Sequence, residues 1–236
     1  MSVTIFRPGK RIYTYGDMGT IDIRQQRSAA AAANWWDLLP NVWAAYQPKG
    51  AASLAASYLD LSGNGNNAGV GVAPTWDGTN GWIFNGSTQY LTTTFTPAAD
   101  QSQTIIVQFT NGTGAATRVI VGSLGSTGGG GPYFLLETNY GGSSCFYGNG
   151  AFVAVVPVLA AGNLGVAGNR GYRNGVAEGA AITAAAGTYW PVYIGAANGG
   201  GTACYFWPGN IQALALCDAT ESADDILAAV TAMAAL

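Results

Sequence analysis

The sequence predicts an all-β protein, a two-sheet antiparallel jelly-roll β-sandwich with an extended N-terminal arm and one C-terminal helix. Short apolar segments alternate with turn residues from about residue 80 to residue 216, as expected where two sheets pack face to face. The dipeptide Asn-Gly occurs seven times and suits the two positive-φ positions of a type I′ hairpin turn. Nearly half of the 236 residues are apolar, which is enough to fill one core.

The first 33 residues differ in charge from the rest of the chain. They carry five basic and two acidic side chains, a net charge of +3, whereas the remainder carries four basic and ten acidic groups, a net of −6. Alternating segments at 3–6 and 20–23 can add as strands to another sheet. We therefore expect residues 1–33 to be a docking arm and residues 34–236 to be the sandwich domain. The residues expected to carry the docking are Phe6, Arg7, Lys10, Arg11 and Arg24.

The elements of the sandwich domain follow in chain order. Residues 34–40 read as a short helical or turn connector that ends at Pro40, because proline disfavours helix in the residue before it. The Gly-rich tract 125–131 reads as a loop, since it lacks the Lys-Ser/Thr ending and the following helix of a phosphate-binding loop. The expected strands include 82–84, 90–92, 104–109, 118–121, 133–136, 152–156, 192–194 and 211–216.

The last element is an amphipathic helix that begins after Ser222. Ser222 can cap it, with Asp225 at the third position of a capping box. The residues expected to form its apolar stripe are Ile226, Leu227, Val230 and Met233. We expect this stripe to pack on the sandwich.

Several chemistries are excluded by composition. The chain contains no histidine, which rules out Ser-His-Asp and Cys-His catalysis and histidine-ligated zinc. Its three cysteines, Cys145, Cys204 and Cys217, lack Cys-x-x-Cys spacing and cannot all pair within one chain. Buried free thiols are expected, with a Cys145–Cys204 disulfide as the alternative.

No targeting or membrane segment is expected. Arg7, Lys10 and Arg11 precede any apolar run, so the N-terminus does not resemble a signal peptide, and no apolar stretch is long enough to span a bilayer. Nucleic-acid binding is not expected either, because the domain is acidic and the arm has few interleaved aromatic residues.

Three blocks of sequence have a familiar order. The first contains the turn Asp60-Leu61-Ser62-Gly63-Asn64-Gly65-Asn66, then Trp82-Ile83-Phe84-Asn85-Gly86 and Tyr90-Leu91. The second is Tyr172-Arg173-Asn174-Gly175, and the third runs from Val192-Tyr193-Ile194-Gly195 through Gly209-Asn210-Ile211 to the terminal helix. Together they resemble the laminin-G-like branch of the concanavalin A-like lectin and glucanase superfamily, as found in phage virion and bacterial surface proteins. The resemblance spans residues 43–236 and implies a jelly roll, but no single activity.

Glucanases of that superfamily carry a Glu-x-Asp-x-Glu strand whose glutamates act as nucleophile and acid/base. No such run exists here. Glu137 and Glu178 have no carboxylate within three residues, so we predict that the protein is not an enzyme.

Candidate ligand sites rest on aromatic and oxygen-bearing residues near turns. The aromatic residues expected to stack on a sugar are Trp207, Tyr205, Tyr140 and Tyr147. No cofactor or metal is expected, although Asp60 and Asn64 offer oxygen atoms of the kind that calcium binds. The alternative is that these side chains close the turn by bonding its backbone N–H groups.

The arm, the sparse charge and the missing signal favour a structural or decorating subunit of a large assembly, such as a phage or virus particle. The expected location is the virion or extracellular surface, and the expected partners are copies of itself and other structural proteins. A carbohydrate-binding, lectin-like adhesion module that recognises surface glycans is the alternative. A glycoside hydrolase is the third and least favoured possibility.

Overall fold

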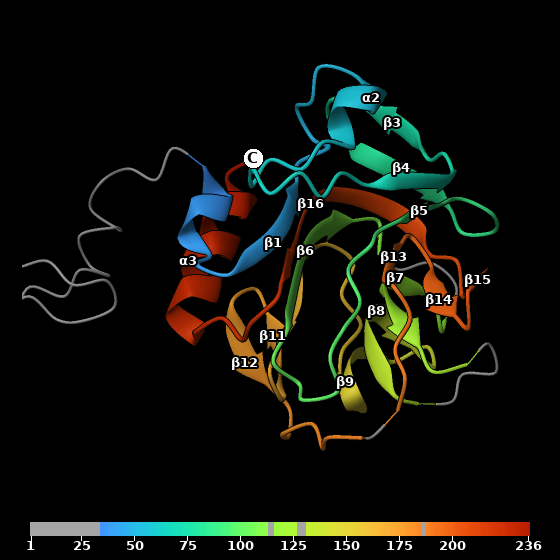
Figure 1. Cartoon of the computed structure of the whole chain (residues 1–236), viewed down its shortest axis with the longest axis vertical. Coiled ribbons are helices and arrows are strands. Elements are labelled where there is room, and N and C mark those ends of the chain that lie inside the picture. The colour runs from blue at the N-terminus through green and yellow to red at the C-terminus, as the bar shows by residue number, and fades with distance from the viewer. Residues whose placement is uncertain (1–33, 113–115, 127–130, 186) are drawn as a thin grey trace, which may run out of the picture.

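The computed structural model describes residues 34–112, 116–126, 131–185 and 187–236, so the predicted docking arm lies outside the described residues. Two eight-stranded sheets, A and B, pack face to face (Figure 1). Their strands are antiparallel except that β14 runs parallel to β7. The predicted all-β sandwich with one terminal helix is confirmed.

Sheet A has the strand order β12-β11-β10-β6-β16-β4-β3, and β1 pairs with the second half of β16. β16 is its central strand and is buried along almost its whole length. The strands are β1 (Val42–Tyr46), β3 (Thr75–Asp77), β4 (Gly81–Asn85), β6 (Thr104–Thr110), β10 (Gly162–Ala167), β11 (Arg170–Arg173), β12 (Val176–Glu178) and β16 (Pro208–Cys217).

Sheet B has the order β15-β14-β7-β13-β5-β2, with β8 paired to β7 and β9 paired to β8. Short helices η1 (Trp35–Leu38) and α2 (Leu54–Ser57) lie outside the sheets. The strands are β2 (Gly69–Val72), β5 (Tyr90–Thr92), β7 (Val119–Leu124), β8 (Tyr133–Tyr140), β9 (Ser144–Val155), β13 (Tyr193–Ile194), β14 (Ala197–Gly199) and β15 (Thr202–Cys204).

The main core lies between the two sheets and is rich in aromatic side chains. Trp82 and Tyr46 from sheet A are fully buried, and sheet B contributes the fully buried Phe134 to the same core. The indole N–H of Trp82 donates to Ser57 Oγ at 2.7 Å, so burying this tryptophan leaves no donor unpaired.

The outer side of sheet A is covered by α3 (Ala223–Ala234) and η1 (Figure 1). Ser222 Oγ accepts the Asp225 N–H at 3.2 Å, which confirms the predicted cap. The buried stripe is Ile226, Ala229, Val230 and Met233, at helical spacing i, i+3, i+4 and i+7. The prediction that Leu227 belongs to this stripe is wrong. Its side chain is 47% exposed, because a position 100° around the helix from Ile226 lies at the rim of the contact between α3 and sheet A.

The prediction that Asn-Gly pairs form hairpin turns is confirmed for only some of them. Asn174-Gly175, between β11 and β12, is the one Asn-Gly pair of the described chain with both residues at positive φ. Asn149-Gly150 lies inside β9 and Asn198-Gly199 inside β14, so those pairs do not turn the chain.

All three cysteines are free thiols, with Cys145 and Cys217 buried and Cys204 half-buried. No helix within the described ranges is long and apolar enough to cross a membrane.

Candidate functional site

The outer side of sheet B carries a second, smaller apolar cluster. In β8, Phe134 and Leu136 point into the main core, so Leu135 and Glu137 face outward by the period-two alternation of a strand. Val119, Leu124, Leu135 and Ala197 form the buried floor of the cluster, and Tyr133, Tyr140, Cys204 and Tyr205 pack on it. Two of the four predicted sugar-contacting residues, Tyr140 and Tyr205, are therefore brought together.

Phe152 of β9 extends this cluster. Its ring centroid lies 5.6 Å from that of Tyr133, with the ring planes at 87°, and 5.9 Å from that of Tyr140, at 57°. Both distances lie in the range that favours contact between aromatic rings. Phe152 is nevertheless 44% exposed, so part of this surface is open to a ligand. We call Tyr133, Tyr140, Phe152 and Tyr205 the outer aromatic face.

Backbone geometry positions two members of this face. Tyr140 ends β8 at a tight turn, where the Ser143 N–H donates to the Tyr140 carbonyl at 3.2 Å and Gly141 and Gly142 have positive φ. Tyr205 has a φ of +52°, which side chains other than glycine seldom adopt. Its carbonyl accepts the Val119 N–H at 2.8 Å, which fixes it beside the cluster floor.

The other two predicted sugar contacts are buried in the main core. Trp207 is 1% exposed, its indole N–H donates to Thr138 Oγ1 at 3.1 Å, and its ring meets Phe109 edge-on at 6.0 Å. Tyr147 is fully buried. Neither ring has a face on which a sugar can stack, because both are enclosed by the core. The glycines and Pro208 near them predicted loops, whereas Tyr147 lies within β9 and Trp207 immediately precedes β16.

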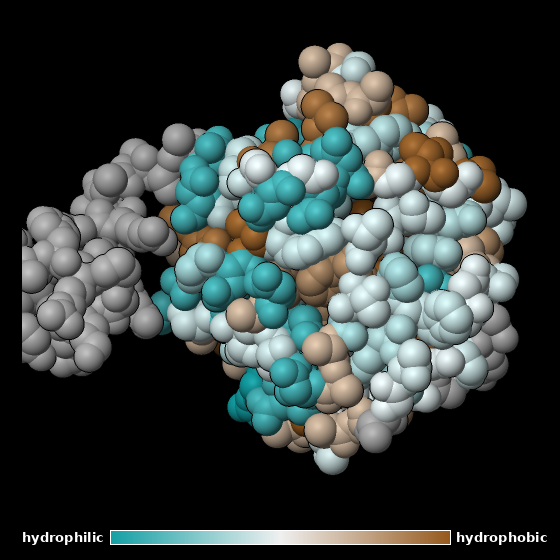
Figure 2. Space-filling model, in the orientation of Figure 1, coloured by the Kyte–Doolittle hydropathy of each residue, from teal (hydrophilic) through white to brown (hydrophobic). Residues whose placement is uncertain are grey.

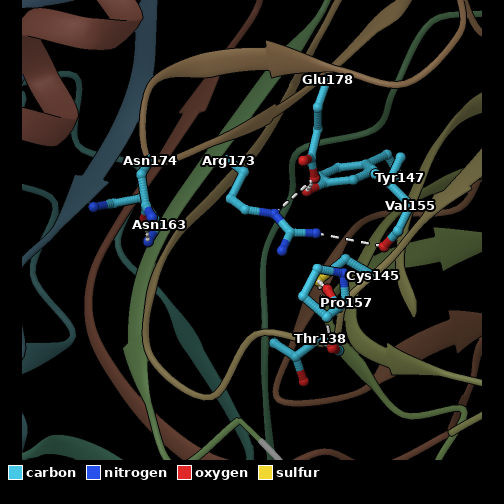
Figure 3. A network of polar contacts seen from close by, with 9 residues as sticks. All are labelled: Thr138, Cys145, Tyr147, Val155, Pro157, Asn163, Arg173, Asn174 and Glu178. Carbon is cyan, nitrogen blue, oxygen red and sulfur yellow. Dashed lines mark hydrogen bonds and ion pairs between the residues drawn. The ribbon is translucent and has the colours of Figure 1, made fainter. Parts of the chain in front are cut away.

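Tyr147 instead joins the two sheets (Figure 3). Its hydroxyl donates to Glu178 Oε1, which also accepts from Arg173 Nε at 2.9 Å, and Arg173 Nη2 donates to the Val155 carbonyl at 3.4 Å. Burial, reinforced by the hydrogen bond to Glu178, raises the pKa of Tyr147 far above its ordinary value. β9 of sheet B is thus tied to β11 and β12 of sheet A.

Glu137 lies within β8 rather than at a strand end. It is only 4% exposed, its Oε2 atom has no hydrogen-bond partner, and burial raises its pKa to about 7 although nearby Arg118 acts in the opposite direction. Glu137 faces outward from sheet B, whereas Glu178 meets Tyr147 on the inner side. The two glutamates therefore do not form a facing pair of carboxylates.

The Asp60 turn, weighed as a calcium site, binds backbone groups. Asp60 Oδ1 accepts the N–H groups of Ala45 at 3.0 Å and Ser62 at 2.9 Å, and Oδ2 accepts the Asn66 N–H at 3.0 Å. Burial opposes ionisation, but these hydrogen bonds outweigh it and lower the pKa of Asp60. The Asp60 oxygens thus accept backbone N–H groups of the turn, as expected if the side chain closes the turn.

The asparagines of the same turn protect the free edge of β1. Asn64 Nδ2 donates to the Val42 carbonyl at 2.8 Å, and Asn66 Nδ2 donates to the Trp43 carbonyl at 2.7 Å. Both amides thus present nitrogen, not oxygen, to the strand. Within the described ranges, no three Asp, Glu or Cys side chains gather in a group that could hold a metal ion.

Sequence reasoning missed Tyr133, Phe152 and Trp190, the last of which is 39% exposed. The sequence predicted 152–156 as a strand but did not assign its exposed side. Cys145, Tyr147, Ala151 and Val153 face the main core, so alternation continued through Gly148 and Gly150 places Phe152 outside. This alternation is present in the sequence, but Gly148 and Gly150 have no side chains to mark the outward side of the strand.

Comparison with known proteins finds solved structures with a similar fold. No family model and no curated protein matches the sequence. Trypanosoma rangeli sialidase is similar with a TM-score of 0.53 and 17% identity over 80% of this chain and 32% of the sialidase. The same sialidase in complex with 2,3-difluoro-KDN gives a TM-score of 0.54 and 15% identity over 81% of this chain and 32% of that one. Domain 4 of the GH43 arabinanase AbnA from Geobacillus stearothermophilus, in complex with arabinotriose, has a TM-score of 0.48 and 11% identity over 80% of this chain and 98% of the domain.

The two sialidase likenesses concern the fold, a β-sandwich, and the chain spans about a third of each sialidase. They contradict the prediction that the protein is not an enzyme. That prediction was wrong as a deduction, because the lack of a Glu-x-Asp-x-Glu run speaks against one glucanase mechanism only, whereas this fold occurs within chains that are sialidases.

Proposed function

We propose that this chain binds carbohydrate through the outer aromatic face. The observation that carries the proposal is Phe152, which is 44% exposed and in ring contact with Tyr133, edge-on, and with Tyr140, at a tilt of 57°. An exposed apolar ring set among tyrosines suits a pyranose, because the C–H face of the sugar stacks on the ring while phenol hydroxyls bond its hydroxyl groups.

The charge of the domain favours a neutral sugar. Subtracting the arm's +3 from the chain's −3 leaves −6 on residues 34–236. A negative domain repels acidic saccharides at long range. We therefore expect neutral glycans to bind in preference to those that carry carboxylate or sulfate groups.

The test is a glycan array with the full chain, followed by titration of the best ligand against variants. Phe152→Ala and Tyr140→Ala should each weaken binding at least tenfold. Val176→Ala is the matched control, since Val176 is 65% exposed on β12 of the other sheet, and it should bind as the wild type does. The proposal fails if no glycan binds, or if Phe152→Ala binds normally while circular dichroism shows it folded.

The role of structural or decorating subunit in a phage or virus particle, at the virion or extracellular surface, is a second proposal. It is supported by the opposite charges of residues 1–33 and of the domain. Charge reversal at Lys10, Arg11 and Arg24 should reduce association in the full chain, measured by light scattering, and more at low salt than at high salt. An unchanged mass at both salt concentrations would remove this support.

A further inference from the structure

The edge of sheet B at β2 is open and apolar. Among the described strands β2 pairs only with β5, through Gly69 opposite Thr92 and Val70 opposite Leu91. Val70 is 51% exposed and Val72 45% exposed. The segment that follows α2, whose Leu61 N–H bonds β1 of sheet A, also exposes Leu59 by 49% and Leu61 by 37%, and Figure 2 shows apolar groups at the surface around α2. An open, apolar strand edge is a template for another strand.

Two other edges are covered. The free edge of β1 is closed by the turn at residues 60–66, where Leu61 N–H donates to the Ala45 carbonyl at 2.8 Å. At β9 the Ala151 N–H donates to the Thr183 carbonyl at 2.9 Å. The remaining edge strands, β3, β12 and β15, span three residues each. β2 is therefore the uncovered edge with the most apolar strand surface.

The N-terminal arm contains a segment that fits such an edge. In Thr20-Ile21-Asp22-Ile23 the two isoleucines alternate with polar residues, so in a strand they share one face. Arg24 and Arg27 follow it, and the domain that would receive it carries −6. Backbone pairing with apolar contacts on alternate residues is how peptides add to a sheet edge.

The length of chain between the arm segment and the domain favours docking of the arm on a neighbouring copy. Residues 23 and 34 are eleven residues apart, which reach at most about 40 Å fully extended. The described chain begins beside α3, on the opposite side of the molecule from β5, the partner of β2 (Figure 1). An arm that docked on its own domain would have to pass around the molecule within that reach, whereas a neighbouring copy can be placed to meet it.

We infer that residues 20–23 of one copy add as a strand to the β2 edge of a second copy. This head-to-tail contact builds an oligomer from identical chains. It is independent of the carbohydrate proposal.

The test uses two complementary full-chain variants and the molecular mass in solution. Val70→Lys with Val72→Lys charges the edge at exposed positions, and Ile21→Asp with Ile23→Asp disables the arm segment. The wild type should exceed the 24.1 kDa of one chain, and each variant alone should give that mass. Val176→Lys on β12 is the control, at a position 65% exposed on the other sheet, and it should associate as the wild type does.

Mixing the two variants provides the decisive measurement. The edge variant keeps an intact arm and the arm variant keeps an intact edge, so one contact remains possible and the mixture should contain a species of about twice the single-chain mass. No association on mixing overturns the proposal in favour of an arm that docks on its own domain. Self-association of the arm variant overturns it in favour of edge-to-edge pairing of β2, and a monomeric wild type overturns it outright.

Discussion

Replacing Tyr147 by phenylalanine tests whether the network of Figure 3 stabilises the sandwich. The substitution removes only the hydroxyl that donates to Glu178 Oε1. The ring keeps its place, because it is fully buried and lies against Gly171, where an added Cβ would come within 2.7 Å of the ring. The loss therefore reports on one hydrogen bond between the sheets.

The expected magnitude follows from the exposure of the acceptor. A hydrogen bond to a charged group contributes about 1.5–3 kcal/mol. The Glu178 side chain is 21% exposed and keeps its bond from Arg173 Nε, so water and Arg173 offset part of the loss. We expect Tyr147→Phe to lower the free energy of unfolding by about 1.5 kcal/mol, or the melting temperature by about 3–6 °C for a domain of this size.

Urea unfolding followed by circular dichroism measures the change, and a double-mutant cycle with Glu178→Leu, which removes the acceptor, assigns it to the pair. Tyr90→Phe, which removes a hydroxyl from a half-buried ring on the outer side of sheet B, is the control and should change stability by less than about 0.5 kcal/mol. An equal loss for Tyr147→Phe in the wild-type and Glu178→Leu backgrounds would refute the reasoning, since the hydroxyl would then act through another group.

Three further predictions concern the helix, pH and calcium. Ile226→Ala should lower the free energy of unfolding by about 2–5 kcal/mol, because Ile226 is 1% exposed, whereas Leu227→Ala should lower it by less than about 1 kcal/mol. Thermal unfolding of the two variants compares these losses directly. Burial raises the pKa of Glu137 from 4.5 to about 7, so this carboxyl group keeps its proton to a higher pH in the folded protein than in the unfolded chain. The free energy of unfolding should therefore fall as pH rises from about 4.5 to 7, by on the order of 3 kcal/mol. Glu137→Gln should remove that dependence, and identical pH profiles of the two proteins would contradict it. A chelator should leave the melting temperature unchanged, because the Asp60 oxygens already accept backbone N–H groups; a drop reversed by calcium would make Asp60 a metal ligand.

Local chemistry predicted the elements whose cause is itself local. Ser222 and Asp225 stand at the start of α3, and the cap bonds between them need only one turn of chain. The Asp60 turn was anticipated in one of its two alternatives for the same reason, since Asx side chains bond the backbone a few residues away. Short apolar runs bounded by turn residues likewise predicted strands such as β6 and β16 without any knowledge of their partners.

The side of a strand that becomes buried is not a local property, and the candidate site depended on it. Tyr140 and Tyr147 are seven residues apart beside the same glycines, yet one packs on the outer cluster and the other lies in the main core. The exposed fraction of Phe152 depends on which side of β9 the other sheet covers.

What the sequence by itself determined is the class of fold, the start and cap of α3, and the exclusion of histidine chemistry, because each follows from composition or from neighbours within a few residues. The tertiary structure alone decided that Trp207 is core, that Glu137 and Glu178 lie on opposite sides of sheet B, and that Phe152 faces outward between two tyrosines. Those outcomes depend on which strands pair and which face of each sheet is covered. Pairings such as β16 with β6, about a hundred residues apart, are selected by the packing of the whole core and not by any segment alone.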